Sequence, residues 1–102
     1  MTPIFPDLKD KKILVTGASR GIGKTICEAL AHQGAHVVFN VLPMEENMIP
    51  ELKAHYEKIG GKATPVIFDV TQNEQIKNAI DAFTKEHGDI TGLVNNAGIS
   101  KD

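Results

Sequence analysis

Four short runs of apolar residues, separated by segments with helical spacing, constrain the fold of this chain more than any other feature. The runs are residues 13–15, 37–39, 66–68 and 90–94. Each run is predominantly apolar rather than alternating, which indicates strands that are buried on both faces. Such strands alternating with helices predict a parallel sheet covered on both sides, with the order βαβαβαβ. The fold class is therefore α/β.

The segments between the runs carry signals for helix ends. The first helix is expected over residues 21–33, and the second starts at Pro50 after a loosely structured stretch, residues 42–50. Thr71 and Glu74 have the spacing of a capping box at the start of the third helix.

Length and composition limit the function classes. A chain of 102 residues is long enough for one domain, and its net charge of -2 does not support nucleic-acid binding. The single cysteine, Cys27, cannot form an internal disulfide, which favours the cytoplasm. No apolar run is long enough to span a membrane. The four histidines lack the close spacing of metal ligands, so we expect no metal site and interpret them as surface or helix-end residues.

The loop after the first apolar run, residues 16–23, combines glycines with the start of a helix. Ligands of parallel α/β sheets bind beyond the carboxyl ends of the strands, so this loop is a candidate binding site. Gly17 allows the turn out of the strand, Gly21 lets the backbone approach a pyrophosphate, and Gly23 allows close packing of helix on sheet. The free N–H groups of the helix start, next to Ile22, favour a diphosphate ligand.

Two other interpretations of this loop stay open. Its spacing is Gly-x-x-x-Gly-x-Gly, whereas the standard dinucleotide motif is Gly-x-Gly-x-x-Gly. Gly23, Lys24 and Thr25 match the end of a P-loop, although Ala18 stands where that motif has its first glycine. Asp69, after the third apolar run, resembles the magnesium-binding aspartate of P-loop proteins. The loop is also compatible with a glycine turn that binds no ligand.

The residue that follows the second apolar run bears on the choice of dinucleotide. An acidic side chain there hydrogen-bonds the ribose 2′-hydroxyl and repels a 2′-phosphate. The residue is Asn40, and Ser19 and Arg20 in the first loop are placed to contact an additional phosphate. The charge balance therefore favours NADP over NAD. Alternatively, Asn40 is an ordinary polar loop residue and Arg20 is solvated.

Candidate residues also follow the third and fourth runs. Asp69 is suited to bind an adenine amino group while Val70 lines the adenine pocket, although Asp69 also suits a helix start through its charge. After the fourth run, amides that tie loops together are combined with small residues that admit a bulky ligand. These residues are Asn95, Asn96, Ala97 and Gly98.

The motifs at residues 16–23, 69–70 and 95–98 resemble those of the classical short-chain dehydrogenase/reductase family. The resemblance covers the chain from about Asp10 to its end. The sequence from 95 to 102 and Asn40 are most similar to 3-oxoacyl-acyl carrier protein reductases of fatty acid biosynthesis. The resemblance implies a Rossmann fold that binds NADP(H) and reduces a carbonyl group.

The resemblance also implies which residues contact the cofactor. The loop from Gly17 to Gly23 would hold the pyrophosphate, and Asp69 with Val70 would surround the adenine. The adenosine ribose phosphate would lie near Ser19, Arg20 and Asn40. Asn95, Ala97 and Gly98 would stabilise the sheet and border the ribose and nicotinamide.

The catalytic residues of the family have no counterparts in this chain. Family reductases use a tyrosine as proton donor and a lysine that lowers the pKa of that tyrosine. The single tyrosine is Tyr56, and the lysine position of the family motif is occupied by Gly60. We therefore assign no catalytic residue and expect Tyr56 to pack with its ring inward and its hydroxyl at the rim.

Family members continue for more than another hundred residues. Residues 1–102 are therefore interpreted as the dinucleotide-binding portion of an incomplete fold, without the catalytic and substrate part and inactive alone. The fourth strand would be an exposed edge. That edge would be covered by a partner, by a second copy in a homo-oligomer, or by the rest of a longer protein, which we favour.

The expected function is NADP(H)-dependent reduction of 3-oxoacyl thioesters or another small molecule in the cytoplasm, without nucleic-acid or membrane partners. A non-catalytic nucleotide-binding or interaction module is one alternative. A P-loop nucleotidase is the other.

Overall fold

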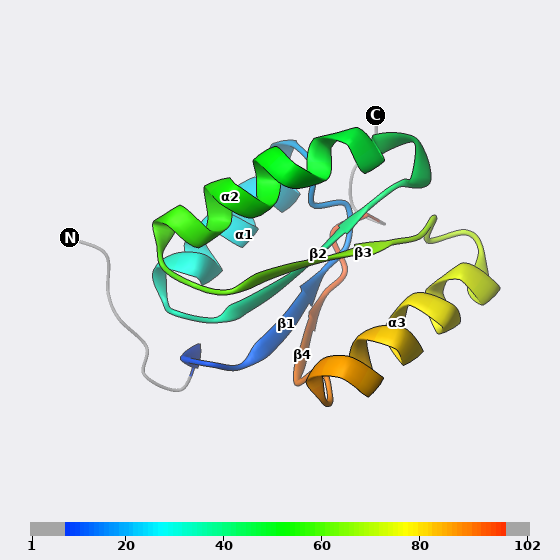
Figure 1. The fold of residues 1–102 in the computed structure, drawn as a ribbon. Coiled ribbons are helices and arrows are strands. Elements are labelled where there is room, and N and C mark those ends of the chain that lie inside the picture. Colours follow the sequence, from blue (N-terminus) through cyan, green and yellow to red (C-terminus); the bar gives the residue numbers. More distant parts are fainter. Residues whose placement is uncertain (1–7, 98–102) are drawn as a thin grey trace.

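A computed structural model describes residues 8–97, and its four strands form one parallel sheet in the order β3-β2-β1-β4 (Figure 1). The strands are β1 (Lys12–Val15), β2 (His36–Val41), β3 (Ala63–Ile67) and β4 (Gly92–Val94). They alternate with helices along the chain. The α/β class, the Rossmann-type sheet and the order βαβαβαβ are therefore confirmed.

β1, β2 and β3 begin before their apolar runs because pairing extends beyond the most apolar residues, whereas β4 begins at Gly92, after the start of its run. β2 is the longest strand, and all six of its residues are buried because β1 and β3 flank it. Pro65 lies inside β3, opposite Phe39, rather than in front of the strand. Proline is tolerated there because β3 pairs with β2 alone among the described strands, so one side of its backbone needs no donor.

Three α-helices connect the strands, namely α1 (Gly21–His32), α2 (Ile49–Ile59) and α3 (Asn73–His87). The stretch expected to be loosely structured contains a short 3-10 helix, η2 (Pro43–Met48). The capping-box prediction for α3 is wrong. Its N-cap is Gln72, and the Thr71 hydroxyl instead donates to Oδ1 of Asp69 at 2.7 Å.

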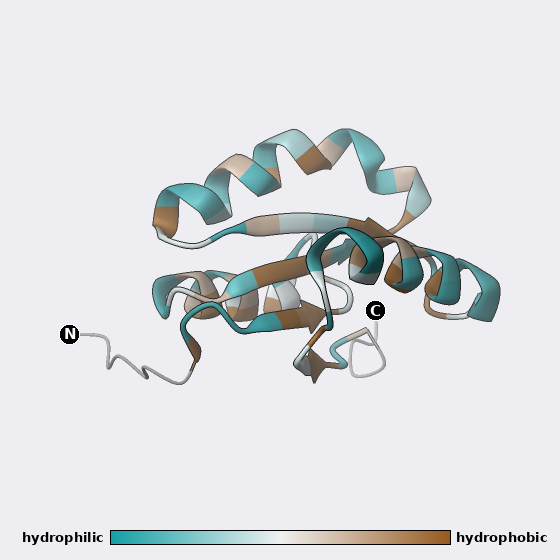
Figure 2. Cartoon of the chain, turned by 60° about the horizontal axis from the view of Figure 1, so that its bottom comes forward, coloured by the Kyte–Doolittle hydropathy of each residue, from teal (hydrophilic) through white to brown (hydrophobic). Residues whose placement is uncertain are grey.

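α1 and α2 cover one face of the sheet, and α3 covers the other (Figure 1). The core on the first face includes Phe39 and Tyr56, whose ring centroids lie 5.2 Å apart. Val38, the neighbour of Phe39, faces the second cluster with Phe83 of α3. Both faces of β2 are thus buried, which explains its continuous apolar run. In Figure 2 the strands carry hydrophobic segments, and the helices alternate between hydrophilic and hydrophobic segments.

The interpretation of all histidines as surface or helix-end residues is wrong for His36. It lies buried on β2, with Nε2 2.7 Å from Oγ1 of Thr64 and its ring against Phe83 and His87. Burial, followed by the nearby charge of His87, lowers the pKa of His36 to about 4. His36 is therefore a neutral core residue at pH 7. Within residues 8–97, no helix combines the length and the apolar character that crossing a bilayer requires.

Candidate functional site

A cavity of about 500 Å³ opens at the carboxyl ends of β1 and β2. Because β2 and β4 lie on opposite sides of β1, the cavity is at the point where the strand order reverses. The lining residues come from the glycine loop, from the segment after β2 and from the loops after β3 and β4. They are Gly17, Ser19, Arg20, Gly21, Ile22, Asn40, Leu42, Met44, Glu45, Val70, Asn96 and Ala97. This is the part of the fold in which a ligand was expected.

Most of the predicted site residues line this cavity, and a few do not. Gly23, Asp69 and Asn95 are absent from its lining. Gly98 lies outside the described residues. Leu42, Met44 and Glu45 line the cavity but were missed by the sequence analysis, because they fall in the stretch that was expected to have little structure.

The N-terminus of α1 is directed at the cavity without an acceptor of its own. Its N-cap residue, Arg20, has an extended backbone and makes no side-chain capping bond, and the first turn has no acidic residue. The N–H groups of the first turn lack carbonyl partners within a helix, and the helix dipole is positive at this end. The residues present therefore fit a diphosphate group.

Contacts from three other elements fix the glycine loop. The backbone N–H of Gly17 donates to Oδ1 of Asn40 at 2.9 Å, and that of Ala18 donates to the Asn40 carbonyl at 3.0 Å. Asn96 donates from Nδ2 to the Gly17 carbonyl at 3.1 Å. From the helix layer, the Tyr56 hydroxyl donates to the Ala18 carbonyl at 2.9 Å. The loop is thus held from β2, α2 and the segment after β4.

Gly23 lies against the loop itself. A Cβ atom on this residue would overlap the Gly17 carbonyl and lie 2.7 Å from Nδ2 of Asn96. Only glycine allows the first turn of α1 to approach the loop this closely.

Asn40 joins the ends of two strands to the loop. Its side-chain amide is buried, and Nδ2 donates to the carbonyl groups of Val41, Val66 and Phe68 at 3.1, 3.3 and 3.0 Å. With Oδ1 on Gly17, both ends of the amide have protein partners. Asn40 thus lines the cavity while its side chain links β2 and β3 to the loop. Its contact with a ribose phosphate stays a prediction.

Tyr56 is fully buried, so the expectation of a hydroxyl at the rim is wrong. Burial is the main cause that raises the pKa of Tyr56, and the neighbouring Cys27 adds to it. The phenol therefore stays neutral, and its hydroxyl keeps the proton that it donates in the hydrogen bond to the Ala18 carbonyl. Its position supports the loop from the side away from the cavity.

The turn after β3 is stabilised by its own residues. Oδ1 of Asp69 accepts from the N–H and the hydroxyl of Thr71 at 2.9 and 2.7 Å, and the Asp69 N–H donates to Gln75 at 2.9 Å. The two Thr71 bonds hold the pKa of the Asp69 carboxyl below its usual value. Val70 lines the cavity, whereas the predicted adenine contact of Asp69 remains untested.

The asparagines after β4 divide between two sides of the sheet. Asn96 and Ala97 line the large cavity, and the Ala97 N–H donates to the Thr16 hydroxyl at 3.0 Å. Asn95 accepts from the same hydroxyl at 3.2 Å but lines a separate cavity of about 220 Å³ with Leu93. Thr16, which the sequence analysis did not single out, thus ties β1 to this segment.

Glu45 is the acidic residue of this cavity that the sequence analysis missed. Its Oε2 accepts from Oγ of Ser19 at 2.8 Å and from Nη2 of Arg20 at 3.2 Å. Its Oε1 accepts from the Leu42 N–H at 2.9 Å. No periodicity in the sequence links residues 19 and 45, so the pairing becomes evident only in the fold.

The residues of the P-loop interpretation do not converge on the large cavity. Lys24 lines a different cavity, of about 230 Å³, together with Glu51 and His55. The Thr25 hydroxyl bonds the Gly21 carbonyl within α1 at 3.3 Å. This arrangement favours the dinucleotide interpretation. Within residues 8–97, no three metal-ligating side chains gather into a site.

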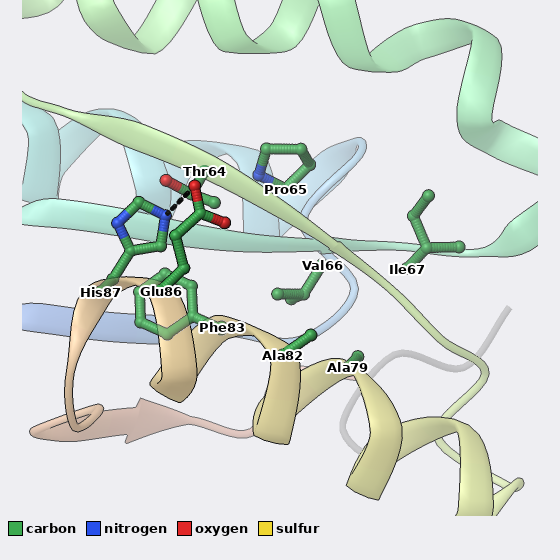
Figure 3. Close-up of a pocket in the computed structure, with 9 residues that line it drawn as sticks. All are labelled: Thr64, Pro65, Val66, Ile67, Ala79, Ala82, Phe83, Glu86 and His87. Carbon is green, nitrogen blue, oxygen red and sulfur yellow. Dashed lines mark ion pairs between the residues drawn. The ribbon is translucent and has the colours of Figure 1, made fainter.

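A further cavity of about 290 Å³ lies between β3 and α3 (Figure 3). Its walls include Val66, Phe83 and His87, and the figure marks the ion pair of His87 with Glu86, 3.8 Å apart. No residue of the glycine loop lines it. We therefore place the candidate site at the strand ends.

The family assignment agrees with this geometry. The sequence model of the short chain dehydrogenase family matches residues 11–102. The chain belongs to this family. The resemblance inferred from the three motifs is thereby confirmed, including the classical branch.

Curated relatives have different named activities. The chain is 39% identical over 99 residues to gluconate 5-dehydrogenase of Gluconobacter oxydans and 37% identical over 95 residues to 3-oxoacyl-[acyl-carrier-protein] reductase FabG of Thermotoga maritima. The matches cover 97% and 93% of the chain but 38% of each relative. Membership is thus clear, whereas these names do not single out one substrate.

Solved structures of the family include both forms of the cofactor. An NADH-dependent reductase, A1-R', complexed with NAD superposes with a TM-score of 0.82 at 30% identity, covering 90% of this chain and 38% of that one. L-sorbose reductase of Gluconobacter frateurii, complexed with NADPH and L-sorbose, superposes with a TM-score of 0.79 at 30% identity, covering 87% and 34%. A nicotinamide cofactor is therefore supported, and both a 2′-hydroxyl and a 2′-phosphate on its adenosine ribose occur among these structures.

Proposed function

We propose that this chain is the dinucleotide-binding part of a carbonyl reductase that uses NADP(H) or NAD(H). The observation that carries the proposal is the N-terminus of α1, which has no side-chain cap and faces a 500 Å³ cavity at the point of strand reversal. An anionic diphosphate is the group that this end of a helix binds best. The chain spans less than two-fifths of the length of the curated relatives described above. The activity of the whole protein is accordingly part of this proposal.

The cavity suits the remainder of a dinucleotide as well. Three of its lining residues, Ile22, Met44 and Val70, are large hydrophobic side chains with exposed fractions of 64, 83 and 36%. A planar base covers such side chains favourably, because apolar surface leaves water. We place the adenine between Met44 and Val70, and the diphosphate on the loop from Gly17 to Gly23.

In this function the residues of the chain bind and orient, and they do not exchange protons with a substrate. The nicotinamide supplies the hydride when it is bound. The Tyr56 hydroxyl is buried and bonded to Ala18, so it is unavailable as a proton donor. We propose that the donor belongs to the whole protein outside these residues.

The substrate class is proposed from the resemblance of residues 95–102 and Asn40 to reductases of 3-oxoacyl thioesters. The relatives named for gluconate chemistry make a small polyol acid the competing class. We also propose a cytoplasmic location. A further strand would pair with β4, where Leu93 is 63% exposed, either in the rest of the protein or in a second copy.

Calorimetric titration of the 102-residue chain with NADPH, NADH and ATP with magnesium tests this proposal. We expect binding of at least one dinucleotide, no hydrolysis of ATP and no oxidation of NADPH by a 3-oxoacyl thioester. Hydrolysis of ATP would instead support the P-loop interpretation of the glycine loop. Turnover of the thioester by the chain alone would show that its catalytic groups were misplaced, and binding to neither dinucleotide would overturn the site.

A further inference from the structure

The carboxylate of Glu45 accepts hydrogen bonds from the two side chains that were predicted to bind an additional phosphate, Ser19 and Arg20. Ser19 and Arg20 both direct their donors to Oε2 of Glu45, at 2.8 and 3.2 Å. The Glu45 side chain is 12% exposed and that of Arg20 is 75% exposed. The carboxylate is thus the largely buried partner of the pair, and the guanidinium is the exposed one.

The position of Glu45 is set by its own backbone segment. Oε1 of Glu45 accepts from the Leu42 N–H at 2.9 Å, which caps the start of η2. Pro43 follows directly and fixes the backbone at the first position of this 3-10 helix. The carboxylate is therefore held at the edge of the cavity before any ligand enters, and a ligand cannot push it away without breaking this cap.

This position adjoins the part of the cavity where an adenosine ribose would lie. The inference rests on the proposed function, in which the ribose lies beyond the end of β2. The segment from Asn40 to Glu45 leads directly from β2 along the cavity wall. Residues that follow the second strand of such folds contact the 2′ substituent of the ribose.

We infer that Glu45 is a specificity-determining residue that opposes a 2′-phosphate by competing with it for Ser19 and Arg20. A 2′-phosphate is an anion that needs these donors, and it would meet a carboxylate already bound to them. A 2′-hydroxyl is a donor itself and gives a hydrogen bond to the same carboxylate. Glu45 thus lowers the affinity for NADP(H) and leaves the affinity for NAD(H) intact.

The inference changes the meaning of Arg20. In the sequence, Arg20 beside the uncharged Asn40 favours NADP. In the structure, its positive charge is compensated by Glu45 at 3.2 Å. The contribution of Arg20 to phosphate binding therefore depends on the release of Glu45.

Glu45→Gln is the variant that tests this inference. Glutamine has the same shape but no charge, and its single amide oxygen can accept either from Leu42 or from Ser19 and Arg20, not from both. Removal of the competing charge should tighten NADP⁺ binding by about tenfold and leave NAD⁺ binding within about threefold. Glu46→Gln is the matched control, because Glu46 is an exposed neighbour in η2 that does not line the cavity.

Arg20→Gln completes a double-mutant cycle with Glu45→Gln. If Glu45 acts by competing for Arg20, the gain in NADP⁺ affinity on Glu45→Gln should fall to about threefold or less in the Arg20→Gln background. Dissociation constants for NAD⁺ and NADP⁺ are measured by calorimetry on all four proteins, and thermal unfolding checks that each is folded.

The outcomes separate the inference from the proposed function. A selective gain in NADP⁺ affinity, absent from Glu46→Gln, supports the inference. Equal changes for both dinucleotides, or the same gain from Glu46→Gln, overturn it while the dinucleotide site stands. Failure of every folded protein to bind either dinucleotide overturns the proposed function, and the inference with it.

Discussion

The loops that follow β1 and β3 both begin at the carboxyl edge of the sheet, but one is fixed by distant residues and the other by its near neighbours in the sequence. The loop after β1 is bonded to Asn40, Tyr56 and Asn96, which are between 23 and 79 residues away along the chain. The turn after β3 is bonded to Thr71 and Gln75, which are two and six residues from Asp69. The first depends on the tertiary fold, and the second depends on its own sequence.

The difference shows that the loop after β1, rather than the turn after β3, is the part of this site that is fixed before a ligand binds. A diphosphate demands several N–H groups in one geometry, and a loop fixed by its surroundings supplies that geometry before the ligand arrives. The turn after β3 contributes Val70 to the cavity wall and needs less precision. Changes in the distant contacts of the first loop should therefore cost more than changes in the second.

The largest expected effect is that of Gly23→Ala. The new methyl group would overlap the Gly17 carbonyl, so the first turn of α1 must move away from the loop. We expect a loss of about 3 kcal/mol in the free energy of unfolding and no measurable dinucleotide binding. Gly21→Ala is the control, because its Cβ would meet nothing within 4 Å and only its φ of +61° opposes the change. Denaturant unfolding should give it a loss of about 1–2 kcal/mol, and equal losses for the two variants would contradict the close-packing argument.

Asn40→Ala should have the next largest effect. It leaves the Gly17 N–H and three buried carbonyl groups without their amide partner. We expect a loss of about 2–3 kcal/mol on urea unfolding, together with weaker dinucleotide binding. Asn96→Ala removes a single bond to the same loop, at 3.1 Å, and should cost about half as much. A smaller loss for Asn40→Ala than for Asn96→Ala would mean that the link between β2 and β3 through the Asn40 side chain is unimportant.

Tyr56→Phe isolates the support of the loop from the helix layer. The ring stays against Phe39, while the Ala18 carbonyl loses its donor at 2.9 Å. We expect a loss of about 1–2 kcal/mol in stability and a shift of the Ala18 and Ser19 amide resonances. Val37→Ala alters the same core and leaves the Tyr56 hydroxyl in place, so those resonances should change less in that variant. An unchanged loop spectrum in Tyr56→Phe would show that α2 does not position the loop.

Acid titration should have the smallest effect, and it should separate the two loops directly. The pKa of Asp69 is lowered by the bonds from Thr71, so these bonds contribute stability at neutral pH and lose it as the pH falls through that lowered pKa. The Thr71 amide resonance should therefore move in acid. Contacts of the glycine loop with Asn40, Asn96 and Tyr56 involve no group that titrates there. In the Glu45→Gln variant, which removes the carboxylate that contacts Ser19 and Arg20, the Gly17 resonance should therefore follow only global unfolding. Simultaneous movement of both resonances before unfolding would contradict the comparison.

The sequence predicts the sheet well because its signals are local. The apolar runs identify the four strands of the described residues, and the glycine spacing identifies the loop. The capping box at Thr71 is wrong because the N-cap is the next residue, Gln72, while the N–H and the hydroxyl of Thr71 both donate to Asp69 in the turn before the helix. The burial of His36 depends on Thr64 and Phe83, which lie far along the chain.

The sequence predicts the glycine positions that shape the backbone of the site, but it does not predict the side chains that contact this backbone from distant parts of the chain. Glycines reveal themselves by type and spacing, because few residues tolerate their conformations. Glu45 and Tyr56 are ordinary residue types, and they acquire their roles only when η2 and α2 pack beside the loop. A carboxylate paired with Arg20 across 25 residues leaves no periodic trace in the sequence.

The most direct test follows the amide resonances of the ¹⁵N-labelled chain during titration with NAD⁺. We predict that the largest shifts fall on residues 17–23, with smaller shifts at Leu42 and Val70, because the diphosphate binds the N–H groups at the start of α1. Shifts confined to the cavity between β3 and α3, or shifts at Lys24 and Thr25 that appear with ATP and magnesium but not with NAD⁺, would contradict this account.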